Sequence, residues 1–538
     1  GGAWRLIRSD GGCASCGSGD ATYARDDRGR VGREQGADGY ITPTTYANDV
    51  VVSVQESLKP FGCDPQTDPQ RCRLDPDALA AATLESTSSS VTTTYEYADP
   101  LWPDRPTKIL RPSIVVGVGG RSGDGEYIAF REEWRFYHTT GALTRHEHRA
   151  RRGDVFHSHA TTWTFYEGTS NAPTFDPGGV FQSSWLSLPQ PVGLIRTVNG
   201  PRTDAQDITS YVYYPIDGSV PALLRSRLAA VKNAAGHITR FESYDVFGNA
   251  TRVVDPNGVA TETTFDALGR PLTNTTKAMP GCNTALDPLC SVDVTTTRLY
   301  TPASGPLARV TSPRGGVTVY TYDERGRLHI LSRGNGASDL SERIETTYDP
   351  LTGKKNHESR QGLLDDEWTE LWSQSFVYDD RARLESVVHA DGAAVHYTYD
   401  AEDRIATVRD ENHAAPNTTY AYDPAGRVSR VIQTLATQPG GSITTRYTYH
   451  LDGSPASVTD PNGNVTSYVY DDFGQLVTQT SPVTGETAYD YDRAGNLILT
   501  VVANGRLATR QYDALNRVIS ATSEGASLSE TVTWTYDD

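Results

Sequence analysis

A tyrosine that returns every 21 residues limits the fold of this chain more than any other feature. The anchors in the most regular stretch are Tyr449, Tyr470, Tyr491 and Tyr512. In the last three repeats an Asp follows the tyrosine, then two variable residues, a Gly or its substitute, a long polar residue and an aliphatic residue. A short unit that repeats in this way cannot bury a core alone, so it must be stabilised by contact with its neighbours.

The repeated unit has the turn residues of a β-hairpin. In the segments 471–474 and 492–495, Asp stands at the first turn position, where its carboxylate accepts backbone N–H groups, and Gly stands at the fourth. A left-handed Gly at that place makes a bulged hairpin, with Tyr at the end of the incoming strand. Asn516 replaces this Gly, and we expect it to adopt the left-handed conformation too. The segment 460–463, Asp-Pro-Asn-Gly, predicts the return turn, so each unit supplies two strands.

The repeat is legible from about residue 205 to the end of the chain. Its tyrosines are Tyr244, Tyr322, Tyr378, Tyr399, Tyr422, Tyr449, Tyr470, Tyr491 and Tyr512. Its turn residues are Asp245, Gly248, Asp266, Gly269, Asp323, Gly326, Asp423, Gly426, Asp471, Gly474, Asp492, Gly495 and Asp513. We therefore predict an all-β fold, with a divergent, β-rich N-terminal part over 1–204 that carries an insertion bounded by cysteines, and a hairpin array over 205–538 that carries an insertion at about 275–298.

An array of this length predicts a curved sheet. About a dozen hairpins would form a sheet on the order of 115 Å long, which is too long to stay flat. It must coil or split, and a stack of ordinary β-sandwiches is the alternative.

Units such as YTYDERGRL (320–328), YAYDPAGRV (420–428) and YVYDDFGQL (468–476) resemble the YD repeats of the RHS family. That family includes bacterial polymorphic toxins, the C component of insecticidal toxin complexes, wall-associated proteins and the animal teneurins. The resemblance is strong over 205–538 and weaker before it. It implies a sheet that spirals into a hollow shell, which in the bacterial toxins encloses a C-terminal effector. We expect both ends of this chain to be truncated, since the closing segment and the toxin of the family are not visible in it.

Two functions from different classes follow from this resemblance. The first is a structural shell segment of an exported protein that encapsulates its own C-terminal toxin or effector. The alternative is an extracellular adhesion or cell-surface fibre protein on the same scaffold, with a cell-surface or glycan partner. The formal charge of −18 argues against nucleic acid as a partner, and we find no apolar run long enough to span a bilayer. No phosphate loop, nucleophile elbow or HExxH motif is visible, so we do not expect an enzyme.

Four histidines form two His-x-His pairs, His146 with His148 and His157 with His159. On paired strands each pair points to one face, so the four imidazoles could converge on a zinc or similar ion. That ion is the one cofactor we consider. The alternative is a group of half-exposed hairpin residues that become charged at acid pH.

The six cysteines form three close pairs. Cys63 with Cys72 and Cys282 with Cys290 enclose short Asp- and Pro-containing segments, and we expect a disulfide in each. Cys13 with Cys16 is either a disulfide or a metal or redox CxxC pair. Paired cysteines favour an oxidising compartment, and thus a secreted or cell-surface protein.

The disulfide prediction can be checked on the natural protein by mass spectrometry without reduction. We expect Cys63, Cys72, Cys282 and Cys290 to resist alkylation until a reductant is added. Free, alkylatable thiols at these four positions would contradict an oxidised, exported protein.

Overall fold

The computed structural model describes residues 5–6, 22–26, 28, 30–35, 40–47, 50–60, 79, 82, 84–112, 129–152, 155–167, 172–278, 291–301, 305–435, 441–450, 452–525 and 528–536. All six cysteines, and with them the three predicted pairings, lie outside these residues. In the described residues no helix is long and apolar enough to cross a membrane.

The described chain forms one antiparallel sheet of 38 strands. The N-terminal strands are β1 (Arg5–Leu6), β2 (Thr22–Arg25), β3 (Val31–Gln35), β4 (Ile41–Ala47), β5 (Val50–Pro60), β6 (Leu84–Glu96), β7 (Lys108–Pro112), β8 (Ala129–Tyr137), β9 (Leu143–Arg152), β10 (Val155–Phe165), β11 (Ile195–Asn199), β12 (Ile208–Tyr213) and β13 (Leu228–Lys232). The middle strands are β14 (Ile238–Tyr244), β15 (Ala250–Val254), β16 (Ala260–Phe265), β17 (Pro271–Thr276), β18 (Val294–Tyr300), β19 (Leu307–Thr311), β20 (Val317–Tyr322), β21 (Leu328–Gly336), β22 (Asp339–Tyr348), β23 (Lys355–Leu364), β24 (Glu367–Tyr378), β25 (Leu384–His389), β26 (Ala394–Tyr399) and β27 (Ile405–Arg409). The C-terminal strands are β28 (Thr418–Tyr422), β29 (Val428–Thr434), β30 (Ser442–Tyr449), β31 (Pro455–Thr459), β32 (Val465–Tyr470), β33 (Leu476–Ser481), β34 (Gly485–Tyr491), β35 (Leu497–Val502), β36 (Leu507–Tyr512), β37 (Val518–Glu524) and β38 (Ser529–Thr533).

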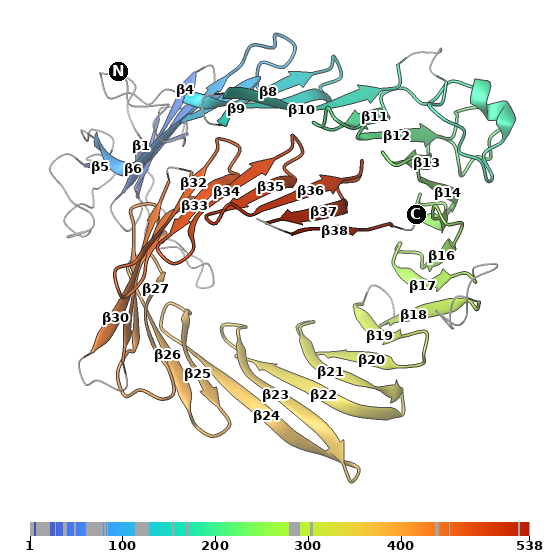
Figure 1. Cartoon of the computed structure of the whole chain (residues 1–538). Coiled ribbons are helices and arrows are strands. Elements are labelled where there is room, and N and C mark those ends of the chain that lie inside the picture. Colours follow the sequence, from blue (N-terminus) through green and yellow to red (C-terminus); the bar gives the residue numbers. More distant parts are fainter. Residues whose placement is uncertain are drawn as a thin grey trace.

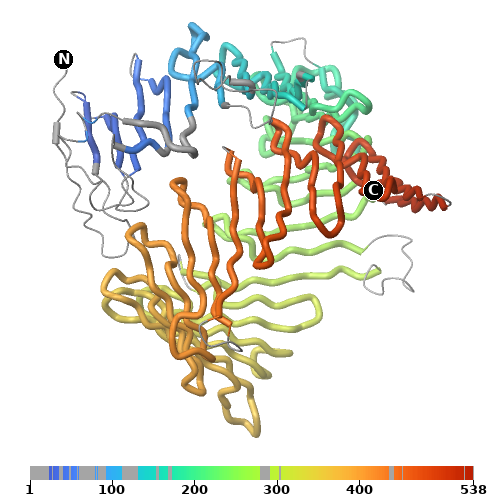
Figure 2. Tube along the Cα trace, turned by 60° about the vertical axis from the view of Figure 1, so that its left-hand side comes forward, coloured from blue at the N-terminus to red at the C-terminus, as the bar shows by residue number. Residues whose placement is uncertain are grey.

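Each strand pairs with the next one in the chain, from the β1–β2 pair to the β37–β38 pair. The sheet is therefore a continuous meander of hairpins. It bends round until the C-terminal strands come to lie beside the N-terminal ones (Figure 1). The turned view shows the same ribbon from its left-hand side, with the C-terminal repeats next to the N-terminal strands (Figure 2). The sheet coils, as the sequence predicts, and does not split into sandwiches.

The sheet is continuous across residue 204, where the sequence repeat fades. Asn199 at the end of β11 pairs with Ile208 at the start of β12. The insertion at about 275–298 likewise leaves the sheet unbroken, because Thr276 of β17 pairs with Val294 of β18. Divergence and insertion thus change the loops and not the order of the strands.

A hydrophobic core forms where residues 172–229 pack against the sheet. Trp185, in the 3-10 helix η1 (Ser183–Ser187), is buried against Phe181, Val212 and Tyr214. By contrast, the C-terminal strands are half-buried on both faces. All six residues of β35 are of intermediate exposure, and no residue of β33 or β34 is buried. The C-terminal repeats are therefore a single-layer wall.

The predicted turns have the expected geometry. Each turn Asp named above accepts the backbone N–H groups of the residues two and four positions later, as Asp423 does from Ala425 and Arg427 at 3.0 and 2.9 Å. The six turn glycines have positive φ, and Asn516 has a φ of 62°. Every repeat tyrosine is the last residue of its strand, next to a register shift such as that between Val469 and Tyr470. These features confirm the bulged hairpin.

Neighbouring repeats are joined by the basic residue that follows the turn Gly. The Arg427 Nε donates to the Asp423 carboxylate at 2.8 Å, and one Nη donates to the carbonyl of His450 at 3.0 Å. The same guanidinium lies over the Tyr449 ring, 4.5 Å from its centroid, while the Tyr449 hydroxyl donates to the Val428 carbonyl at 2.7 Å. We call this set the repeat clamp. Its arginines over the next tyrosine include Arg30, Arg270, Arg327, Arg383, Arg404, Arg427 and Arg517.

Two substitutions at the left-handed turn position should change hairpin stability in opposite directions. Ala382 occupies it at a φ of 60°, so Ala382→Gly should stabilise its hairpin by about 1 kcal/mol. Gly426→Ala should destabilise its own hairpin by a similar amount, because the new Cβ has room (3.6 Å to Arg404) and only the conformational cost remains. Hydrogen exchange of the flanking strands measures both effects. Changes of the same sign in the two variants would contradict the assigned turn geometry.

Candidate functional site

The clearest candidate site is the line along which the two ends of the sheet meet, which we call the seam. It joins β8–β11, with the loop that follows them, to the turns of the repeats at 450–516. The Asp472 amide donates to the Arg151 carbonyl at 3.0 Å, and the ring of His159 stacks on Phe473 with centroids 3.9 Å apart. The sheet thus docks on itself through the hairpin turns.

Arg152, at the end of β9, makes the largest set of contacts across the seam. Its Nε donates to the Asp471 carboxylate at 3.1 Å, and one Nη donates to the Tyr491 carbonyl at 2.7 Å and to the Asp490 carboxylate at 2.9 Å. Its other Nη donates to the Gln475 side-chain oxygen. These bonds link positions more than three hundred residues apart in sequence.

Arg202 makes a second set of contacts from the loop after β11. Its guanidinium donates to the carbonyl of Asp513 and lies 3.9 Å from the Asp492 carboxylate. It is also held by Asp204, and its side chain is only 3% exposed. A third pair, Arg131 with Asp452 at 3.6 Å, lies at the other end of the seam.

Burial at the seam changes the pKa of one turn aspartate, Asp471. Burial raises the pKa of Asp471 above its usual value, and the Gln475 amide and Arg152 only partly offset this. At Asp513, whose side chain is more exposed than that of Asp471, burial also acts to raise the pKa, but hydrogen bonds from Arg517 outweigh it and lower the pKa. Asp471 therefore depends on Arg152 as a buried carboxylate depends on its partner.

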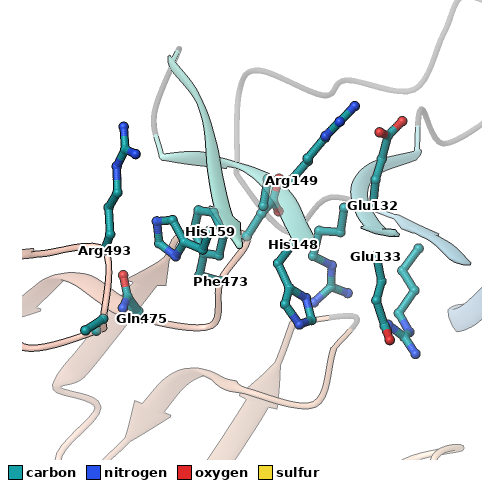
Figure 3. A pocket seen from close by; sticks show the side chains of 14 residues that line it. Glu132, Glu133, His148, Arg149, His159, Phe473, Gln475 and Arg493 are labelled. Carbon is teal, nitrogen blue, oxygen red and sulfur yellow. The ribbon is translucent and has the colours of Figure 1, made fainter. Parts of the chain in front are cut away.

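A cavity of about 340 Å³ lies within the seam (Figure 3). Glu133, His148 and His159 line it from the N-terminal strands, and Phe473 and Arg493 line it from the C-terminal turns. Burial alone would raise the pKa of Glu133. The hydrogen bonds and charges of Arg135 and His146 have a larger combined effect, and the pKa is lowered to about 2. The charges in this cavity are largely paired within the wall.

In the part of the chain that the structure describes, the four predicted histidines are not arranged as a metal site. The two His-x-His pairs do share one face, with His148 opposite His159 in the register. However, in the described part of the chain no group of three or more His, Cys, Asp or Glu residues is arranged to hold a metal ion. His146 bonds to the Glu133 carboxylate at 2.9 Å, and Phe473 covers His159. The imidazoles are thus engaged by the seam, beside arginines that disfavour another cation.

No sequence motif marks the seam arginines directly. Arg131, Arg152 and Arg202 lie in the divergent region, where no repeat marks them. One signal was present in the repeats, because Ser454, Gln475 and Asn496 stand where most repeats have a basic residue. Their departure from the pattern coincides with the seam.

The seam histidines predict a loss of stability in acid. Burial, followed by the nearby Arg152, His157, Arg493 and His148, lowers the pKa of His159 from 6.5 to about 4. Between these two values the unfolded chain binds a proton that the folded chain does not, so stability falls as the pH drops through this window.

We expect the melting temperature to fall between pH 7 and pH 5, and to fall less in a His159→Gln variant. His389→Gln, on β25 away from the seam, is the matched control and should keep the dependence of the unmodified protein. An equal fall in all three proteins would contradict the assignment to His159.

The chain is similar to known proteins in both sequence and structure. The Teneurin YD-shell family model matches residues 356–538, and the RHS Repeat model matches 244–278 and 302–338. No curated protein sequence matches the chain. A crystal structure titled TcdB2-TccC3-Cdc42 aligns at 12% identity and a TM-score of 0.39, covering 96% of this chain and 33% of that chain.

Two further structures align less closely. The Photorhabdus luminescens Tc holotoxin pore aligns at 11% identity and a TM-score of 0.23, covering 93% of this chain and 30% of its own. A porin-like protein from Bacteroides uniformis aligns at 15% identity and a TM-score of 0.18, covering 41% of this chain and 88% of its own. The chain spans about a third of the length of the toxin-complex structures. The YD-shell match covers the C-terminal third of the chain and the two RHS-repeat matches cover segments before it, so over these residues the chain carries repeats similar to those of the RHS and teneurin YD-shell families.

Proposed function

We propose that this chain is a wall segment of a hollow shell that encloses a polypeptide guest. The observation that carries the proposal is the seam: a single-layer sheet bends round and docks on itself. A sheet that only presented an outer surface for adhesion would have no need of contacts between its two ends. We assign the wall a structural role and not a catalytic one.

The wall is stabilised without a second layer of chain. Tyrosine outnumbers phenylalanine 29 to 12. In most repeat tyrosines the hydroxyl donates a hydrogen bond to a backbone carbonyl of the preceding repeat, as Tyr422 does to Ile405 at 2.7 Å. Arginines cover the rings of several of them. Both polar groups and rings are therefore used within the wall, which leaves the faces free of a partner sheet.

Such a wall suits confinement better than specific binding. Across several hairpins, threonine or serine hydroxyls bond to one another, as in the Thr398–Thr407 and Thr448–Ser457 pairs at 2.6 and 2.7 Å. Hydroxyl groups that are satisfied within the sheet offer a guest few strong contacts. We propose that the guest is a toxin or effector of the same exported polypeptide, held by enclosure in a secreted or cell-surface assembly.

Protease protection tests this proposal on the complete natural polypeptide. Parts of it that lie outside residues 1–538 and inside the shell should resist a protease in the intact protein. The same parts, expressed alone, should be digested at least tenfold faster. The wall itself should stay intact in the first digestion, which controls for unfolding.

Equal rates of digestion with and without the wall would contradict enclosure. In that case, binding of the intact protein to cell-surface glycans or proteins would support the adhesion alternative. Both assays use the same preparation, so they separate the two functions directly.

A further inference from the structure

Three consecutive repeats lack the basic residue of the repeat clamp, and these three form the seam. Ser454, Gln475 and Asn496 occupy the position that Arg427 occupies in the repeat before them and Arg517 in the repeat after them. Both flanking arginines make the clamp within their own repeats, with Nε bonds of 2.8 and 2.7 Å to the turn Asp. Asn249 also stands at this position, away from the seam, where it bonds to its own turn residue Asp245 at 2.9 Å. The gaps at the seam differ in being consecutive.

Arg152 takes the place of the missing arginine at Gln475. In the ordinary clamp, Nε donates to the turn Asp, one Nη donates to a carbonyl at the next turn, and the guanidinium lies over the next tyrosine. Arg152 donates from Nε to Asp471 and from Nη to the Tyr491 carbonyl, and lies 5.9 Å from the centroid of the Tyr491 ring. The carboxylate acceptor is equivalent, and the carbonyl acceptor lies one residue earlier, at the tyrosine itself instead of at the first turn residue. The guanidinium comes from another part of the sheet.

The next repeat is completed in the same way. Arg202 lies 3.9 Å from the Asp492 carboxylate and donates to the Asp513 carbonyl, which is the first residue of the following turn. The side-chain amide of Asn496 donates to the same carboxylate oxygen of Asp492, Oδ2, at 2.8 Å. At the third gap the first turn residue is His450 and not Asp, and Arg131 instead pairs with the third turn residue, Asp452, at 3.6 Å.

We infer that the turns of these three repeats form a guanidinium-accepting docking surface, and that arginines from the N-terminal strands complete their clamps in place of the missing residues. The run of three repeats without the basic residue marks where the sheet docks on itself. The exchange sets the register of the seam, since each gap is matched to one arginine. This inference concerns the contact between two parts of the wall and holds whether or not a guest is enclosed.

Only one guanidinium fits each clamp. An arginine at position 475 would start four residues after Asp471, as Arg427 does after Asp423, and would reach the same carboxylate and the next tyrosine. Arg152 would then lose its acceptors and remain as an unpaired charge against the wall. Restoring the common repeat residue should therefore strengthen the hairpin and open the seam.

The test is a double variant, Gln475→Arg with Asn496→Arg, in the complete chain. We expect the amide of Asp472, which donates across the seam to Arg151, to exchange at least tenfold faster. The radius of gyration from small-angle scattering should rise as the two parts of the sheet separate at the seam. Amides in β32 and β33 should remain as protected as in the unmodified protein, which shows that the hairpin is folded.

Two further variants complete the design. Arg427→Gln removes a clamp arginine outside the seam and should speed exchange in β29 and β30 only. Arg152→Ala should speed exchange at Asp472, like the double variant, but without a new arginine. Unchanged exchange at Asp472 in the double variant, with Arg152→Ala either changed or unchanged, would overturn the inference.

Discussion

The structure depends on one interaction, the guanidinium that lies between the turn carboxylate of its own repeat and the tyrosine ring of the next. A single-layer sheet has no core that could fix the angle and distance between hairpins. The clamp does so at the turn end of each hairpin through a charge-assisted hydrogen bond, a ring contact and a carbonyl contact. The tyrosine hydroxyl adds a bond to the strand behind it, so each repeat is held by both of its neighbours.

This arrangement explains how the sheet can be long and still be held where it meets itself. Stability in a repeat protein is a sum of local terms, so hairpins can be added without enlarging a core. A long single layer nevertheless has to be held where it meets itself. The seam uses the same acceptors as the repeats do, with arginines supplied by strands that lie far away in sequence. The two parts of the wall thus dock through the same kinds of contact that join neighbouring repeats.

The turns and the strand ends were predictable because their causes are local. Asp471, Gly474 and Tyr470 act within a few residues of one another, and Asn516 follows the same rule as the Gly it replaces. The seam was not predictable, since Arg152 and Asp471 are 319 residues apart. The histidine face was predicted correctly from strand alternation, but alternation does not show what packs over a face. Phe473 and Glu133 engage two of the imidazoles, and the sequence pattern alone does not reveal these contacts.

A double-mutant cycle across the seam tests the central claim most directly. Arg152→Ala, Asp471→Asn and the double variant would be compared by the free energy of opening at the Asp472 amide. If the sheet docks on itself through this pair, the effects of the two single substitutions on the free energy of opening will be non-additive. The coupling free energy should be about 1 kcal/mol or more, as expected for residues in contact. Additivity within about 0.3 kcal/mol would show that the two residues act independently, and would contradict a sheet that docks on itself through its arginines.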